Sequence, residues 1–206
     1  MAREGFFFSL PFLLLAILFF YLFQKFPHMD LVYLAVSSLI VAFLFMSFFR
    51  DPDRRIPEGD GIIVSPADGR VVALERREGC FVVSIFLSIF NVHINRVPVS
   101  GVVQRVKYQP GKFRPAFQKK AAEQNERFEI TIKADNYSID VHQVAGILAR
   151  RVVCRLTEGQ EVRRGERFGM IRFGSRVDLM LPLDTSFEVQ EGKRVKGGST
   201  IIGRLA

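Results

Sequence analysis

Two long hydrophobic runs without a charge, close to the N-terminus, constrain this chain more than any other feature. Residues 6–23 form a run of 18 such residues, and residues 31–49 form another of 19. At 1.5 Å per residue, each run is about long enough to cross the hydrocarbon core of a bilayer as a helix. The seven residues between them, QKFPHMD, allow only a tight turn, and Pro27 helps to end the first helix. We therefore predict a two-helix membrane hairpin within residues 1–50.

Two other structures would also account for an apolar run at this position. A cleaved signal peptide is disfavoured, because no A-x-A-like site follows the first run and the second run begins almost at once. A shallower, re-entrant hairpin stays open, since Pro11 interrupts the first run and both runs are of marginal length. In either hairpin both ends face one side, and Arg50, Arg54 and Arg55 predict that this side is the cytoplasmic face of the cell (inner) membrane. Lys25, in the turn, weakens that orientation.

The remainder of the chain is predicted to be a charged linker followed by one β domain. The segment RDPDRRIPEGD consists of Arg50 followed by the predicted linker, residues 51–60, and it is rich in charge and proline. Beyond them, short runs rich in Val, Ile and Phe recur between Gly, Pro and Asn or Asp, a pattern typical of strands. We predict a mainly β fold, in which residues 61–206 form a soluble, barrel-sandwich-like domain. The clearest predicted strands are 81–89, 102–108, 128–134, 137–144, 167–173 and 185–190.

Composition excludes several classes. The chain is 49% hydrophobic, which excludes a disordered protein. Cys80 and Cys154 form neither a metal knuckle nor a disulfide framework, which indicates a reducing compartment. The three histidines, His28, His93 and His142, share no ligand spacing, so no metal is predicted. The net charge of +8 could attract nucleic acid, but no aromatic and basic strand motif is present, and no nucleic-acid partner is expected.

The C-terminal segment GKRVKGGSTIIGRLA carries a chemically suggestive pattern. Gly197 and Gly198 can adopt backbone conformations that other residues resist, and the hydroxyl of Ser199 follows directly. That hydroxyl could attack the carbonyl of the Gly198–Ser199 peptide bond, and elimination of the resulting ester would lead to a pyruvoyl group. Taken alone, however, these residues are better interpreted as a flexible turn before a last strand.

Three segments change this balance when they are taken together: SPADG at 65–69, FNVHINRVPVSG at 90–101 and GGST at 197–200. In this order they resemble the phosphatidylserine decarboxylase family in its short bacterial and archaeal form. The resemblance runs from about residue 61 to 206, and a hydrophobic N-terminal hairpin is typical of such short enzymes. It also includes NER at 125–127, VAGILARRV at 144–152 and FGMIRFGSRVDLMLP at 168–182.

The resemblance implies a proenzyme that cuts itself between Gly198 and Ser199. The products would be a β chain, 1–198, and an α chain, 199–206, with Ser199 converted into a covalent pyruvoyl cofactor and no metal required. The implied reaction converts phosphatidylserine into phosphatidylethanolamine through a Schiff base. The implied partners are a serine phospholipid, the membrane, and the two chains of the one proenzyme, while a homo-oligomer is left open.

The family's self-cleavage uses an Asp-His-Ser arrangement. In this sequence the resemblance implies Asp68 from SPADG, His93 from NVHINR and Ser199 from GGST. Long-form members commonly carry HxxHxP, and here Arg96 replaces the second histidine. His93 is therefore expected to act as the base, and also near the substrate carboxylate or as a proton donor. His142 remains the alternative base.

Two alternative functions stay open. One is a non-catalytic, membrane-anchored, lipoyl-like module, which SPADGRVV would also suit. The other is a pyruvoyl decarboxylase of a different serine lipid.

Three segments are left without a definite role. Residues 125–127 receive no role, and residues 115–124 could be a helical turn or a loop. Arg114, Lys119 and Lys120, near Phe113 and Phe117, could equally form a membrane-facing lip or a solvated basic loop.

Overall fold

The computed structural model describes residues 3–112, 124–146, 152–171 and 175–205. The chain divides into two compact units, Met1–Pro52 and Asp53–Ala206.

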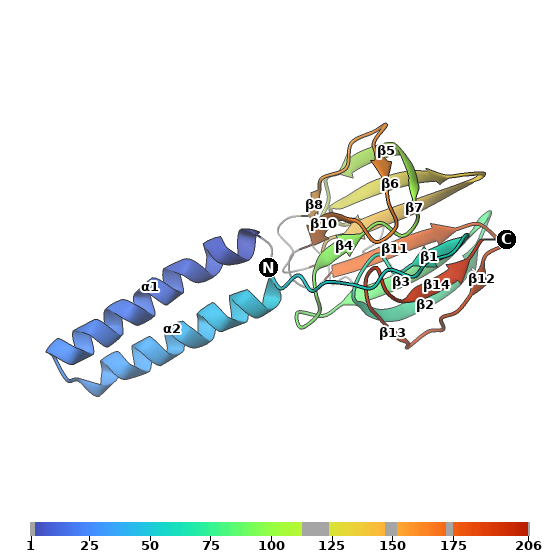
Figure 1. The fold of residues 1–206 in the computed structure, drawn as a ribbon. Coiled ribbons are helices and arrows are strands. Elements are labelled where there is room, and N and C mark those ends of the chain that lie inside the picture. The colour runs from blue at the N-terminus through green and yellow to red at the C-terminus, as the bar shows by residue number, and fades with distance from the viewer. Residues whose placement is uncertain (1–2, 113–123, 147–151, 172–174, 206) are drawn as a thin grey trace. The chain divides into compact units, whose positions relative to one another are not determined.

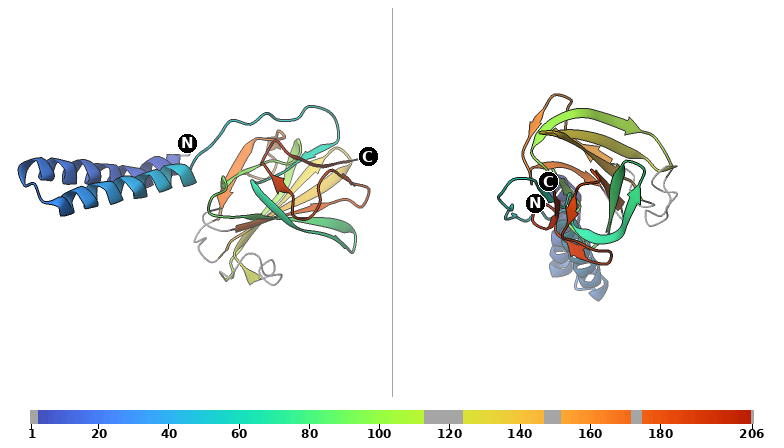
Figure 2. Two further views of the ribbon diagram at one scale, coloured as in Figure 1. Left: turned by 90° about the horizontal axis from the view of Figure 1, so that it is seen from below. Right: turned by 90° about the vertical axis from the view of Figure 1, so that its right-hand side faces the viewer.

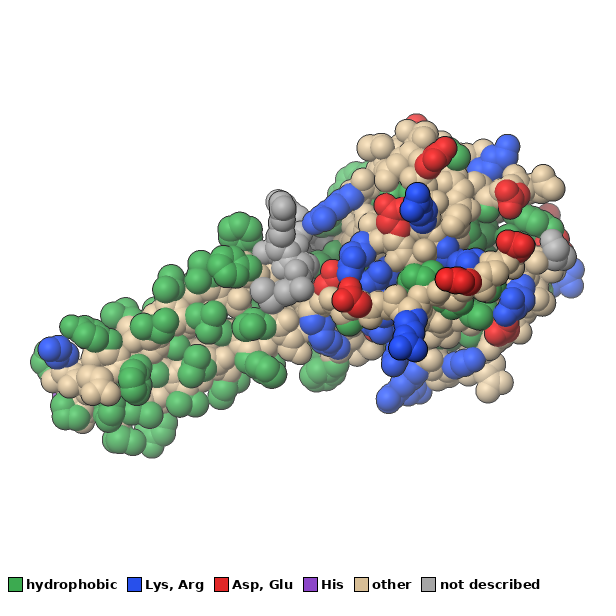
Figure 3. Space-filling model, viewed as in Figure 1, with side chains coloured by type: hydrophobic (Ala, Val, Ile, Leu, Met, Phe, Trp, Pro, Cys, Tyr) green, Lys and Arg blue, Asp and Glu red, His purple; other side chains and the backbone are tan. Residues whose placement is uncertain are grey.

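The first unit is a helical hairpin made of α1 (Arg3–Lys25) and α2 (Met29–Phe48). Phe45 of α2 stacks on Phe8 and Phe12 of α1, with ring centroids 5.7 and 5.5 Å apart. Most other apolar side chains point outward, and Figure 3 shows a largely hydrophobic surface along both helices. A hairpin that exposes Phe, Leu and Ile around its circumference is suited to an apolar solvent. Both helices are long and apolar enough to span a membrane, as predicted.

The second unit is mainly β, which confirms the predicted fold class. Its largest sheet has eight antiparallel strands in the order β13-β2-β3-β11-β7-β6-β5-β9, and it curls into a half-barrel (Figures 1 and 2). Two three-stranded sheets, β1-β14-β12 and β4-β10-β8, complete the unit. The strands are β1 Ile62–Val64, β2 Gly69–Arg77, β3 Cys80–Leu87, β4 Ile94–Arg96, β5 Gly101–Gln109, β6 Arg127–Ala134, β7 Tyr137–Val144, β8 Val152–Cys154, β9 Glu161–Val162, β10 Arg167–Ile171, β11 Ser175–Leu181, β12 Ser186–Phe187, β13 Arg194–Val195 and β14 Ile201–Arg204.

Alternation along the strands explains where the core lies. In β11, Val177 and Leu179 are fully buried on one face, while Arg176 and Asp178 lie on the other. Val141 of β7 is the register partner of Leu179 and points to the same face. The continuous apolar layer inside the curled sheet is therefore a direct consequence of the period-two pattern in the sequence.

Two strand pairs place the segments of chemical interest next to each other. β1 and β2 lie on either side of the SPADG loop, whereas β13 and β14 lie on either side of the GGST turn. β1 pairs with β14 and β2 pairs with β13, both antiparallel. Because both flanking pairs are hydrogen-bonded, the two connecting loops, more than 100 positions apart in the chain, must face each other.

Candidate functional site

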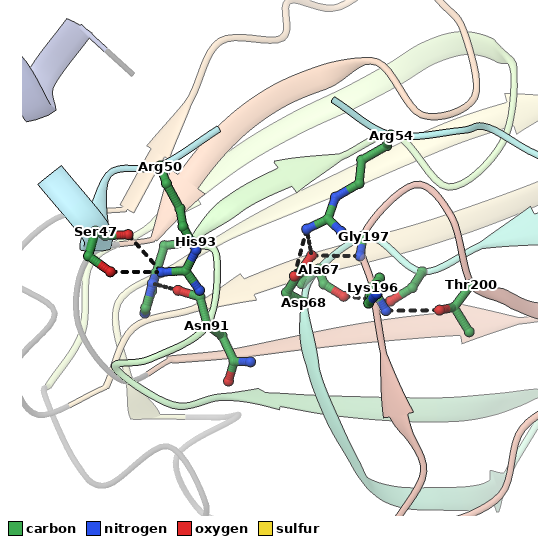
Figure 4. A network of polar contacts seen from close by, with 11 residues as sticks. Ser47, Arg50, Arg54, Ala67, Asp68, Asn91, His93, Lys196, Gly197 and Thr200 are labelled. Carbon is green, nitrogen blue, oxygen red and sulfur yellow. Dashed lines mark hydrogen bonds and ion pairs between the residues drawn. The ribbon is translucent and has the colours of Figure 1, made fainter. Parts of the chain in front are cut away.

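Backbone hydrogen bonds join the SPADG loop to the GGST turn. The Gly198 N–H donates to the Ser65 carbonyl at 2.8 Å, and the Ser65 N–H donates to the Thr200 carbonyl at 2.8 Å. One bond comes from a side chain: Oδ1 of Asp68 accepts from the Gly197 N–H at 2.8 Å (Figure 4). The loop therefore contacts the turn on both sides of the Gly198–Ser199 bond.

The turn itself is tightly closed. The N–H groups of Ser199 and Thr200 both donate to the Lys196 carbonyl, at 3.1 and 3.0 Å, and the Thr200 hydroxyl accepts from the Lys196 N–H. Gly198 has φ +77°, and a Cβ there would lie 2.8 Å from Cδ of Arg96. Glycine is thus favoured at position 198 on both conformational and steric grounds. Ser199, next to it, is half-buried.

Asp68 is fixed by a second partner that the sequence did not single out. Nη2 of Arg54 donates to both carboxylate oxygens, at 2.7 and 3.0 Å, and the two side chains are only 12% and 13% exposed. Arg54 belongs to the segment predicted as a linker, and Ile56 of that segment also lies beside Gly198. Arg54 and Ile56 therefore pack on the β domain. A charged, proline-rich composition signals exposure and gives no sign of such a contact.

His93 lies just before β4 and is fully buried. Its Nδ1 is 2.9 Å from the Asn91 carbonyl, which can only accept, so Nδ1 carries the proton and Nε2 of the neutral ring is the basic nitrogen. The Asp68 carboxylate is bonded to Arg54 and Gly197 within the described residues, and not to His93. His93 is tied to the same loop indirectly, through the Arg96 N–H, which donates to the Pro66 carbonyl at 2.9 Å.

Arg96, the last residue of β4, lies three positions after His93. Its side chain is buried beside Gly198, and Nη1 donates to the Gly165 carbonyl at 2.9 Å. A guanidinium stays protonated in proteins and cannot accept a proton from Ser199. What Arg96 can do is hold a positive charge next to the Gly198 backbone.

His142 lies in the middle of β7, within the eight-stranded sheet, and not in either facing loop. Its register partners are Asp178 of β11 and Glu129 of β6. Burial lowers the pKa of His142, although the charges of Glu129, Asp140 and Asp178 oppose this shift. The ring is therefore neutral around pH 7, among carboxylates that have other partners, such as the Arg176–Asp178 ion pair at 2.8 Å.

The NER segment anchors neighbouring chain segments. Asn125 is buried and donates to the Ala145 carbonyl at 2.7 Å, and Arg127 pairs with Glu129 at 2.7 Å.

The predicted basic lip falls within residues 113–123, outside the described residues, as does most of the predicted helical turn at 115–124. In the described part of the chain no group of three His, Cys, Asp or Glu side chains could hold a metal ion.

Comparison with known proteins bears on this geometry. The family model described as Phosphatidylserine decarboxylase matches residues 41–203. A protein of Ehrlichia chaffeensis named phosphatidylserine decarboxylase proenzyme is 48% identical over 181 residues, which cover 84% of this chain and 80% of the relative. Relatives with the same name in Chlorobium phaeovibrioides and Syntrophus aciditrophicus are 46% and 44% identical; the first match covers 83% of this chain and 82% of the relative, and the second 98% and 96%.

We expect Arg54→Gln to destabilise the β domain by about 1.5–3 kcal/mol, because the poorly exposed Asp68 carboxylate loses a charged hydrogen-bond donor. The matched control is Arg204→Gln, which breaks an ion pair to Glu188 of the same 2.7 Å length but with side chains 47% and 43% exposed. That change is expected to cost about 0–1 kcal/mol. Urea unfolding of the full chain in detergent measures both. Equal losses would contradict the structural role assigned to Arg54.

A pH effect is expected from His142. Since burial holds its folded-state pKa below the unfolded value of about 6.5, the unfolded chain takes up a proton first as pH falls, and stability is lost as pH drops through that value. His142→Gln removes this term, so the wild type should lose more stability than the variant between pH 7.5 and about pH 5. Unfolding midpoints measured across this range test it. Parallel pH profiles for the two proteins would show that the buried ring does not contribute.

Proposed function

The chain belongs to the phosphatidylserine decarboxylase family, and from this premise we propose that it is a proenzyme that cuts its Gly198–Ser199 bond and then converts phosphatidylserine into phosphatidylethanolamine. Membership of an enzyme family argues against the non-catalytic anchored module. The observation that carries the proposal is the hydrogen bond from the Gly197 N–H to Asp68, within two residues of the bond to be cut.

Self-cleavage needs only this chain's own atoms and one water. Ser199 Oγ loses its proton and attacks the Gly198 carbonyl carbon, the C–N bond to Ser199 breaks, and the nitrogen leaves as an amine. Loss of the Ser199 Cα proton then breaks the Cβ–Oγ bond, which releases the Gly198 carboxylate and leaves dehydroalanine. Water hydrolyses the amino group of this residue, which releases ammonia and leaves a pyruvoyl group joined by its amide bond to Thr200. The φ of +77° at Gly198 supports the first step, since such a backbone departs from ordinary extended or helical geometry.

Each site residue has a proposed role in this step. His93 is proposed as the base that accepts the Ser199 proton, supported by the Asn91 carbonyl that leaves Nε2 as the basic nitrogen. Asp68, held by Arg54, is proposed to position the turn through Gly197. Arg96 is proposed to stabilise negative charge that develops on the Gly198 carbonyl oxygen.

The geometry also suits a two-chain product. The proposed α chain, 199–206, contains β14, which pairs with β1 and β12, and its Ile202 is fully buried. These contacts would retain the α chain on the β chain, 1–198, after the cut. A pyruvoyl group at position 199 would supply the electron-withdrawing ketone that decarboxylation of an α-amino acid requires. The neighbouring Thr200, bonded through its backbone to Ser65 and Lys196, would hold that position in place. His93 is proposed to deliver a proton to the substrate.

We also propose where the enzyme works. The hairpin is proposed to anchor the chain in the cell membrane, with residues 51–60 leading to a catalytic domain, 61–206, on the cytoplasmic side. Two apolar helices support the anchor, and the basic residues after α2 support the orientation.

Ser199→Ala is expected to abolish both cleavage and decarboxylation, because it removes the attacking oxygen and the precursor of the ketone. Intact-protein mass spectrometry of the full chain should detect a separate fragment of residues 199–206 in the wild type and a single uncut chain in the variant. Release of CO2 from phosphatidylserine in mixed micelles measures activity, and micelles of other serine lipids define the range of tails accepted. An uncut protein that still releases CO2 would refute the proposal.

Gly198→Ala tests the geometry of the turn. The new Cβ would lie 2.8 Å from Cδ of Arg96 and 3.1 Å from Cδ1 of Ile56, and the residue would also have to adopt φ +77°. We expect cleavage to slow by at least about a hundredfold, the effect of misplacing a reacting group by an ångström. Gly192→Ala is the control, since Gly192 has φ +86° but nothing within 4 Å of a Cβ. It should cleave at nearly the normal rate, and comparable slowing in both variants would mean that general backbone strain is responsible.

A further inference from the structure

A pocket of about 540 Å³ adjoins the GGST turn. Its lining includes three basic residues, Arg70 at the start of β2, Arg194 of β13 and Lys196, which follows β13. The backbone carbonyl of Lys196 accepts from the Ser199 N–H, so the segment that carries Arg194 and Lys196 leads directly into the proposed reactive turn.

Two of these cations are held opposite each other by the sheet. Arg194 is the register partner of Arg70, so both side chains leave the same face of adjacent strands. Like charges in such a pair repel, and neither arginine forms an ion pair with a described residue. Asp68 also lines the pocket, but its carboxylate is already paired with Arg54. The pocket thus contains positive charge that a bound anion would offset.

Aromatic side chains complete the pocket. Phe86 of β3 is the other register partner of Arg70, and Phe90 lies in the loop that follows β3. Phe90 is 76% exposed and its neighbour Ile89 is 48% exposed. A pocket lined by both cations and apolar rings matches a molecule with an anionic group next to a hydrocarbon part.

Another pocket, of about 800 Å³, is a poorer candidate. It is lined by Arg163 and Arg164 but also by Glu161 and Glu166, and its lining does not include the turn. The opposing charges reduce its attraction for an anion.

We propose that the pocket formed by Arg70, Arg194, Lys196, Phe86 and Phe90 binds the phosphodiester of the substrate headgroup. This rests on the proposed function and extends it to substrate recognition. In a serine phospholipid the phosphate is joined to the serine Cα through one oxygen and one methylene group, so the phosphate must lie close to position 199 when the amine reaches it. The arginines bind the phosphate oxygens, and the two rings contact the glycerol and the first part of the acyl chains.

Binding is tested without turnover, in the uncut Ser199→Ala chain in neutral detergent. Glycerophosphoserine and inorganic phosphate are titrated separately by calorimetry. Adding Arg70→Gln or Arg194→Gln should weaken glycerophosphoserine binding roughly tenfold, the effect of losing one charged hydrogen bond. Arg77→Gln is the control. Arg77 lies at the far end of β2, and this substitution removes the same charge as the pocket variants do. It should leave affinity unchanged, and equal affinities in all the proteins would overturn the proposal.

The two anions separate the possible sources of the phosphate. If glycerophosphoserine binds more tightly than inorganic phosphate and the two compete, the pocket recognises the headgroup. If inorganic phosphate binds as well as glycerophosphoserine, the pocket is a general anion site and the substrate assignment is overturned. If the pocket variants and Arg77→Gln all weaken binding to anionic vesicles equally, the effect is a surface-charge effect and the proposal is likewise overturned.

Turnover by the Ser199-containing enzyme separates this proposal from the proposed function. Arg70→Gln and Arg194→Gln should release the 199–206 fragment at the wild-type rate, retain kcat within about twofold, and raise KM for phosphatidylserine roughly tenfold. Normal KM values in both variants would overturn the phosphate site and leave the proposed function intact. A wild-type chain that neither cuts itself nor releases CO2 would overturn the proposed function, while calorimetry would still decide whether the pocket binds the anion.

Discussion

The antiparallel pairing of β1 with β14 and of β2 with β13 is the constraint on which the rest of this structure depends. Each pair is short, yet together they hold the SPADG loop against the GGST turn. The turn is then closed by bonds to Ser65 and Asp68 and by the Lys196 carbonyl. A reactive peptide bond needs such support, because a flexible turn would bring the serine hydroxyl and the carbonyl together only rarely.

The same constraint explains why a segment beyond the strands takes part. Arg54 precedes β1 and reaches Asp68, while Ile56 packs beside Gly198. A carboxylate that is 13% exposed would be costly without a cationic partner, and Arg54 supplies one. The segment after the hairpin therefore contributes to the site as well as connecting the two units.

Charge is distributed unevenly around the turn. On one side Arg54 and Asp68 neutralise each other, and Arg96 is buried near Gly198. On another side Arg70 and Arg194 are paired in register without an acidic partner among the described residues. Both arginines are exposed, so solvent screens part of their repulsion, and the anion proposed to bind there would offset the remainder.

Local patterns were sufficient for the elements and for part of the site. Apolar runs of helical length predicted α1 and α2, and alternation predicted strands such as β6 and β7, because burial of one face imposes a period of two on the chain. The positive φ at Gly198 also follows from a local preference of glycine. Three contacts did not follow from any local pattern. The sequence did not indicate that Arg54 pairs with Asp68, that His93 bonds to the Asn91 carbonyl, or that Arg70 lies beside Arg194. The first two depend on how a loop or a segment outside the strands folds. The third joins residues more than 100 positions apart and depends on strand order and register, which are set by packing of the whole sheet.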